Sequence, residues 1–308
     1  MTSPRPTAPT GMIYSANVGT AVIRLQPLTV EDSEALLDAL MGPLISPFQP
    51  AVRELLTRRA EGNPFFLEEA VRSLLDTGIF KKTPTGTRFS GDLSNLEVPT
   101  TVRGVVLSRI DSLSLGAKQL LLEAAVIGPS FDLTLLRQIA TRPQDVPLQL
   151  ETLLHSDLVN EVATTDDRPP EYRFRNTLIQ EVAYNSLLKK RRTLLHRHIA
   201  ATLERLHAQH LADYLPQLAH HYSQSDDRER ALRYLLRFGD KAAHTYANQD
   251  AMSCYRRALE LLAQADDHEE IKAEVCEKLA DACAASGEPE AGLMKIGSRG
   301  QRELILFL

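Results

Sequence analysis

Apolar residues recur at the spacing of an amphipathic helix along most of this chain, and this pattern limits the fold more than any other feature. The stretch after Thr29 is typical, because the Thr29 hydroxyl can cap the helix start and the leucines that follow share one face. Helices are predicted at about 30–41 and 49–60, and a third begins at Asn63-Pro64. From Thr177 the pattern is helical to the end. The sequence therefore predicts a mainly α protein that opens with a small helical bundle.

Short strands are predicted where the period changes, between residues 158 and 175. Leu158–Val162 and Glu171–Arg175 are strand-like runs, and the polar, proline-containing segment between them suits an irregular hairpin loop. A further short strand is expected around Thr87–Ser90, within a turn-rich linker. Helices are predicted before the hairpin at about 101–111, 115–126, 133–139 and 147–155. Helices followed by one hairpin indicate a winged-helix module with a small β-hairpin.

Small and aromatic residues near the C-terminus fall at the spacing of a tetratricopeptide unit, in which small residues permit close helix approach and aromatic rings fill the gap. They are Phe238, Gly239, Ala242, Ala251, Tyr255 and Ala258. A second, weaker copy begins at Leu279 and continues through Cys283 to Gly287. Two repeats are fewer than a solenoid normally needs, so we expect only the start of a tetratricopeptide-like α-solenoid.

Composition excludes several classes of protein. The formal charge of -5, from 35 basic and 40 acidic residues, gives no overall attraction for nucleic acid or an anionic membrane. The three cysteines, Cys254, Cys276 and Cys283, are too few and too widely spaced for a disulfide framework, and they form no CxxC pair. The sequence has no signal peptide and no run of about 18 apolar residues. We therefore expect a cytoplasmic protein without a membrane segment.

The most distinctive short motif is Glu61-Gly-Asn-Pro-Phe-Phe-Leu-Glu-Glu69. Asn63 can act as a helix cap, and Pro64 suits the first helical position. One interpretation is a well-capped helix start. The other is a helix N-terminus that lies against a nucleotide base or phosphate.

This motif and several later segments resemble the bacterial STAND-type AAA+ ATPases that are fused to class III adenylate or guanylate cyclases or to transcriptional regulators. The resemblance covers roughly residues 24–263. It is carried by Gly62–Glu69, Val98–Leu113, Ala124–Asp132, Tyr172–Tyr184, Leu195-His196 and Leu218–Tyr222.

The resemblance implies a division of the chain into the C-terminal parts of such an ATPase. A disordered leader (1–21) is followed by the helical lid (22–82) and the winged helix (83–176). A helical connector (177–230), tetratricopeptide-like repeats (231–295) and an irregular tail (296–308) complete the chain. The family also implies nucleotide contacts: Pro64, next to Asn63, lies by the adenine, and Asn176 replaces the histidine of a Phe-x-His motif that senses the diphosphate. Asn176 can form hydrogen bonds but cannot become cationic.

The chain lacks the parts of the family that carry chemistry. It has no G-x-x-x-x-G-K-[ST] loop, no acidic strand end for magnesium ahead of the lid and no cyclase domain. We therefore expect a regulatory fragment with no catalytic residue and no cofactor of its own; ATP or ADP with magnesium would bind only with an ATPase core supplied elsewhere. Its expected partners are a protein bound through the helical and tetratricopeptide surfaces, and a separate ATPase or cyclase domain.

The sequence leaves two other functions to consider. A winged-helix DNA-binding regulator would use Pro147–His155 as its recognition helix, but this stretch has no arginine or lysine to reach phosphates or guanine edges. Nucleic acid is therefore not an expected partner. An ATP-binding protein with a cryptic site is disfavoured by the missing glycine-rich loop.

The spacing of the histidines does not indicate a metal site. His196 and His198 are two residues apart, and His220 and His221 are adjacent. Neither pair has the i, i+4 spacing with which one helix holds a metal between two histidines, so no metal is predicted. The basic stretch Lys189–Arg192 is expected to be a solvated surface rather than a phosphate or nucleic-acid contact.

Overall fold

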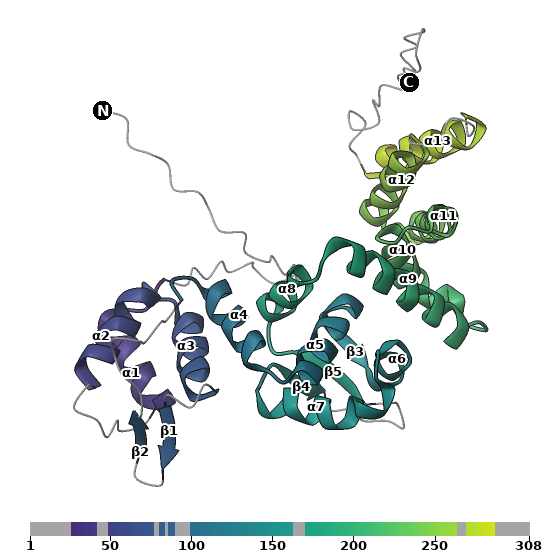
Figure 1. The fold of residues 1–308 in the computed structure, drawn as a ribbon. Coiled ribbons are helices and arrows are strands. Elements are labelled where there is room, and N and C mark those ends of the chain that lie inside the picture. The colour runs from purple at the N-terminus through teal and green to yellow at the C-terminus, as the bar shows by residue number, and fades with distance from the viewer. Residues whose placement is uncertain are drawn as a thin grey trace, which may run out of the picture. The chain divides into compact units, whose positions relative to one another are not determined.

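The computed structural model describes residues 26–41, 49–76, 80–83, 86–89, 99–162, 170–263 and 269–286, and these residues confirm a mainly α fold (Figure 1). The chain divides into two compact units, Met1–Val102 and Arg103–Leu308. Within the described ranges, no helix is both long and apolar enough to cross a membrane. The expected leader (1–21) and tail (296–308) lie outside the described residues.

The N-terminal unit contains helices α1 (Val30–Met41), α2 (Gln49–Ala60) and α3 (Pro64–Asp76), and strands β1 (Phe80–Thr83) and β2 (Gly86–Phe89). Helices α1 and α2 begin and end, and α3 begins, where the apolar periodicity predicts. The three helices bury Leu37, Leu56 and Leu67 completely. The two strands pair antiparallel, with Phe80 opposite Phe89. Strand β1 was not predicted. The expected domain boundary at 82/83 falls inside it, so the hairpin belongs with the N-terminal unit.

The turn that enters α3 requires a glycine at position 62. Gly62 has a φ of +76°, and a Cβ placed on it would lie 2.6 Å from the backbone oxygen of Leu28. The Leu28 N–H donates to the Gly62 oxygen at 2.8 Å, which fixes this close approach. Gly62 of the Glu61–Glu69 motif therefore forms the turn through which the backbone passes from α2 to α3.

Replacing Gly62 with alanine should destabilise the N-terminal unit. Left-handed backbone at a non-glycine residue costs about 1–3 kcal/mol, and the clash with Leu28 adds to it. Urea unfolding followed by circular dichroism would measure the loss. Asn63→Gly is the matched control, because glycine at a cap position costs only a few tenths of a kcal/mol. Equal stability of Gly62→Ala and the wild type would contradict the assigned turn.

The second unit begins with helices α4 (Val102–Ser112), α5 (Leu115–Ile127), α6 (Leu133–Ile139) and α7 (Val146–His155), with a 3-10 turn at Pro143–Asp145. Strands β3 (Ser130–Asp132), β4 (Val159–Val162) and β5 (Glu171–Phe174) form an antiparallel sheet in the order β3-β5-β4. The hairpin β4–β5 confirms the predicted strand pair, with Val159 opposite Phe174. Strand β3 was not predicted; Phe131 on it contacts the rings of Tyr172 and Phe174 on β5.

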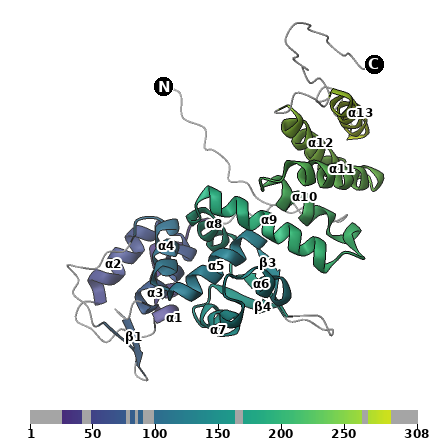
Figure 2. The same ribbon diagram turned by 45° about the vertical axis from the view of Figure 1, so that its right-hand side comes forward.

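Six further helices follow: α8 (Thr177–Ser186), α9 (Lys189–Leu206), α10 (Leu215–Ser223), α11 (Arg228–His244), α12 (Asn248–Leu262) and α13 (Glu269–Ser286), with a 3-10 turn at Leu211–Tyr214. Helices α10 to α13 pack in sequence order, each against the next (Figure 2). We call α10 to α13 the helical stack. Its first helix among the described residues, α10, lies within residues 177–230, the segment that was expected to be a connector.

The predicted close approach of small and aromatic residues occurs between α11 and α12. A Cβ on Gly239 would lie 2.7 Å from the ring of Tyr255, so the ring packs directly against the glycine backbone. The Tyr255 hydroxyl donates to Asp240 at 2.9 Å, and Lys278 of α13 pairs with the same carboxylate. Glycine, ring and ion pair together connect three consecutive helices.

Candidate functional site

Asn63 and Pro64 form the start of α3, as the motif predicted. The backbone N–H groups of Phe65 and Phe66 donate to the Asn63 side-chain oxygen at 3.0 and 3.3 Å. Pro64 is the first helical residue, and both it and Asn63 are exposed. The amide oxygen of Asn63 is therefore engaged in capping its own helix, and the exposed proline ring is the part available to a ligand.

Asn176 also caps a helix. It follows β5 directly, and its side-chain oxygen accepts from the N–H of Ile179 at 2.9 Å at the start of α8. The neighbouring Arg175 pairs with Asp157, which lies just before β4, at 2.5 Å. Asn176 belongs to the second compact unit and Asn63 to the first. The structure gives each residue a structural role at a helix start.

Helix α7, the candidate recognition helix, presents an uncharged or acidic face to solvent. Pro147, Leu148 and Glu151 are exposed, and Leu148 retains 65% of its accessible surface. This face carries no lysine or arginine, and the exposed His155 lies at its end.

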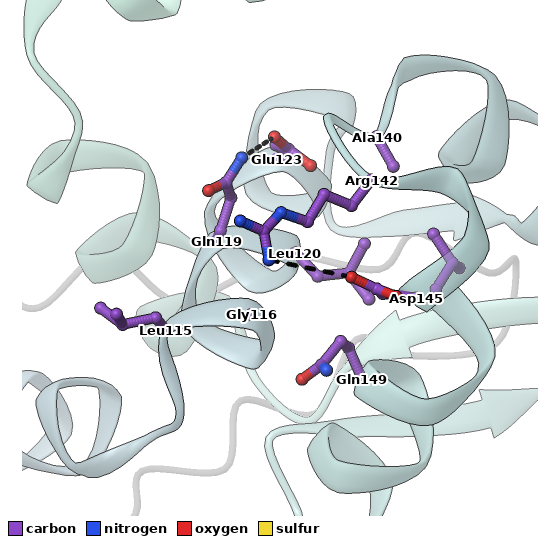
Figure 3. Close-up of a pocket in the computed structure, with 10 residues that line it drawn as sticks. Leu115, Gly116, Gln119, Leu120, Glu123, Ala140, Arg142, Asp145 and Gln149 are labelled. Carbon is purple, nitrogen blue, oxygen red and sulfur yellow. Dashed lines mark hydrogen bonds and ion pairs between the residues drawn. The ribbon is translucent and has the colours of Figure 1, made fainter.

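A cavity of about 270 Å³ lies between α5 and α7, where Gln119, Glu123, Arg142 and Asp145 surround it (Figure 3). Glu123 is almost completely buried. Its carboxylate accepts from the Thr141 hydroxyl at 2.5 Å, the Thr141 N–H at 3.3 Å and the Gln119 amide at 3.0 Å. These donors satisfy both oxygens, so Glu123 anchors the loop after α6.

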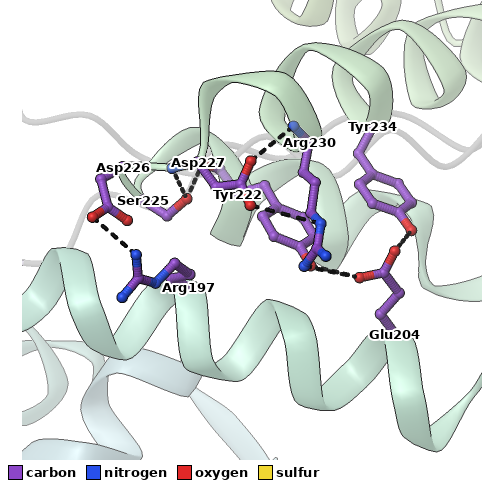
Figure 4. Close-up of polar contacts among 8 residues, drawn as sticks. All are labelled: Arg197, Glu204, Tyr222, Ser225, Asp226, Asp227, Arg230 and Tyr234. Carbon is purple, nitrogen blue, oxygen red and sulfur yellow. Dashed lines mark hydrogen bonds and ion pairs between the residues drawn. The ribbon is translucent and has the colours of Figure 1, made fainter.

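A polar network links α9, α10 and α11 at the base of the helical stack (Figure 4). The rings of Tyr222 and Tyr234 stack with centroids 5.2 Å apart, and their hydroxyls donate to the two oxygens of Glu204 at 2.6 and 2.5 Å. Arg230 donates to the Tyr222 hydroxyl at 3.1 Å. Burial alone would raise the pKa of the Glu204 carboxyl. The hydrogen bonds from the two tyrosines and the charge of Arg230 together lower it by more than burial raises it, so the net shift of the pKa is downward. Glu204 therefore stays ionised and holds three helices together.

His196, His220 and His221 meet between α9 and α10, although no metal was predicted from the spacing of His196 and His198 or of His220 and His221. Nδ1 of His196 lies 2.9 Å from Nδ1 of His221, and Nε2 of His196 lies 3.0 Å from the Tyr184 hydroxyl. His196 and His221 are buried, whereas His220 is exposed. Burial, with the nearby His220 and Arg192, lowers the pKa of His196 to about 4, so the cluster is neutral near pH 7. Sequence spacing within one helix could not reveal it, because the ligand atoms come from two helices.

Comparison with known proteins gives two findings. A family model described as a domain of unknown function, DUF8739, matches residues 29–79, which hold α1 to α3. An uncharacterized protein, R02095, from Rhizobium meliloti (strain 1021) is 22% identical over 275 residues, which are 89% of this chain and 26% of that protein. The chain thus spans about a quarter of the length of this relative. No solved structure matches the chain.

Proposed function

We propose that this chain is a non-catalytic regulatory segment of a STAND-type AAA+ signalling ATPase. In this role it couples the binding of a protein partner on α10 to α13 to a nucleotide-dependent switch in an ATPase core on other segments. The proposal rests on the resemblance carried chiefly by Gly62–Glu69, Val98–Leu113 and Tyr172–Tyr184, from which Asn176 departs. The length of the relative supports it, since a chain that matches about a quarter of a protein can work inside a longer assembly. The proposed location is the cytoplasm.

The observation that best supports a coupling role is the continuous core of the second unit. One cluster of buried side chains includes Val126 and Leu135 near the sheet, Leu203 on α9, and Met252 and Cys283 in the stack. Because packed interiors resist deformation, a displacement of the stack would be transmitted to the winged helix rather than absorbed between them. In an intact protein, a partner that binds one arrangement of these elements more tightly would shift the nucleotide-bound population.

The partner surface is proposed to be the outer face of the stack. Tyr246, in the turn between α11 and α12, is 87% exposed. Its φ of +58° projects this aromatic residue from a tight turn. Exposed tyrosines are enriched among residues that dominate protein interfaces, because they bury a large area with little loss of side-chain freedom.

ATP binding by the purified chain is the first test. Calorimetric titration with ATP and magnesium should give no binding heat, because the chain has no phosphate-binding loop.

The DNA upstream of this reading frame should then encode an ATPase core with that loop. Adding the chain to the purified core should change the rate of ATP hydrolysis. The variant Tyr246→Ala should leave that change intact, since Tyr246 is proposed to face the partner rather than the core.

Micromolar affinity of the isolated chain for ATP would overturn the proposal in favour of a cryptic nucleotide site. An upstream sequence without an ATPase core, or a core whose hydrolysis rate is unaffected by the chain, would also contradict it.

A further inference from the structure

The three histidine rings at the junction of α9 and α10 are arranged as in a metal centre. Their centroids are 5.7 Å apart for His196 and His220, 5.1 Å for His196 and His221, and 5.1 Å for His220 and His221. One nitrogen from each ring can be chosen so that all three lie within 4.8 Å of one another. For a tetrahedral ion with Zn–N distances of about 2.0–2.1 Å, ring centroids would be about 5 Å apart. The observed triangle is close to that geometry.

The Nδ1 atoms of His196 and His221 need little movement to reach ligand positions. Two nitrogens bound to one tetrahedral zinc are about 3.3 Å apart, and the Nδ1 atoms of His196 and His221 are separated by 2.9 Å. In the metal-free chain, these two atoms share one proton in a hydrogen bond. For a divalent ion to bind both Nδ1 atoms, the ring that donates in this hydrogen bond must move its proton to its own Nε2, so that each neutral ring offers a lone pair at Nδ1. His220 has the largest distance to cover, and its exposed side chain is the least restricted of the three.

The groups around the rings suit metal ligation. When Nδ1 of His196 binds a metal, its Nε2 carries the proton and can donate to the Tyr184 oxygen 3.0 Å away. Such a partner fixes the tautomer and ring orientation, as outer-sphere residues do in established metal sites. The guanidinium of Arg192 lies 4.7 Å from the centre of the Tyr184 ring and holds that ring in place. Its charge, which lowers the pKa of His196, also opposes a cation at the site, so the affinity must come from the three imidazole nitrogens. His220, at the surface, leaves one side of the triangle open to a water ligand.

We propose that His196, His220 and His221 form a three-histidine site for a divalent transition metal of the zinc class, which cross-links α9 to α10. Imidazole nitrogen is a preferred ligand of zinc, and three protein ligands with one water complete a tetrahedron. The ion joins the last helix packed on the winged helix to the first helix of the stack. The site is independent of the proposed regulatory function, since it requires neither nucleotide nor a partner.

The test is titration of the EDTA-treated full chain with zinc chloride in a calorimeter, and with cobalt chloride in a spectrophotometer. One zinc ion per chain should bind with a dissociation constant in the micromolar range or below. Cobalt should give the intense visible absorption of a tetrahedral nitrogen site. His220→Ala removes an exposed ligand without opening the core, and it should weaken zinc binding at least about 10-fold. Tyr184→Phe keeps the ring but removes the hydroxyl, and it should weaken binding about 10-fold.

His198→Ala is the matched control, because His198 lies on the same helix outside the cluster, near the Gln138 backbone oxygen. It should bind zinc as the wild type does. Absence of stoichiometric zinc binding would overturn the proposal. So would a loss in His198→Ala equal to that in His220→Ala, which would indicate adventitious binding to surface histidines. Circular dichroism of each variant distinguishes a lost ligand from a lost fold.

Discussion

The metal-free chain is expected to lose about 2 kcal/mol of unfolding free energy between pH 7 and pH 5 through His196 alone. The folded protein holds this imidazole neutral, with a pKa of about 4 against an ordinary value of 6.5. Below pH 6.5 the unfolded chain binds a proton that the folded chain does not, so this contribution is present above pH 6.5 and is lost as the pH falls toward 4. His221, whose pKa is lowered by burial, His196 and His220, adds to the loss in the same direction.

The groups that face His196 decide the size of this effect. Tyr184 of α8 donates or accepts at Nε2, while Arg192 of α9 and His220 of α10 add unfavourable charge when the ring is protonated. Urea unfolding of the EDTA-treated chain at pH 7, 6 and 5 would measure the slope. His196→Gln removes the titrating group, and its slope should be shallower by the amount that His196 contributes. A wild-type slope equal to that of His196→Gln would show that the ring is not buried in neutral form.

The second large effect is expected from Gly239→Val, which should destabilise the second unit by about 3 kcal/mol. The first added carbon would already lie 2.7 Å from the Tyr255 ring, and the two valine methyl groups extend further into it. The ring cannot turn away freely, because its hydroxyl is bonded to Asp240. Valine is a better helix former than glycine by a few tenths of a kcal/mol, so propensity alone predicts the opposite sign.

A double-mutant cycle with Tyr255→Leu isolates the clash. If ring and valine compete for one space, the double variant should be more stable than the sum of the single effects by over about 1 kcal/mol. Ala243→Val, on the half-buried side of the same helix, should cost under about 1 kcal/mol and serves as the control. Additive effects of Gly239→Val and Tyr255→Leu would mean that the helices do not approach as closely as described.

Helix positions could be predicted from the sequence because their signals are local. Thr29 and Asn63, the two helix caps expected from the sequence, accept backbone hydrogen bonds from Asp32 and Phe65. Asn176 also caps a helix, which the sequence analysis did not predict. Strand β3 could not be predicted in the same way. It has three residues, and it exists only through pairing with β5, about 40 residues later in the chain.

The polar groups buried in the second unit could not be predicted, because they are brought together by packing between helices and not by their spacing along the sequence. Glu123 is a buried carboxylate because Thr141 folds back onto it, 18 residues away. His196 meets His221 across 25 residues, so each helix considered alone gave no indication of a cluster. The sequence would predict the contact between His196 and His221 only if α9 and α10 were already known to pack against each other, because then the two histidines could be placed on facing sides.

Helix α9 packs on three helices at once, with α5 and α6 along one part of its surface and α10 along another. This arrangement fixes the number of residues in the helix. One inserted residue would turn all that follows by about 100° and advance it by about 1.5 Å, so one set of contacts would be lost whichever set was kept. Homologues should therefore vary in length in their surface loops while the 18 residues of Lys189–Leu206 remain constant in number.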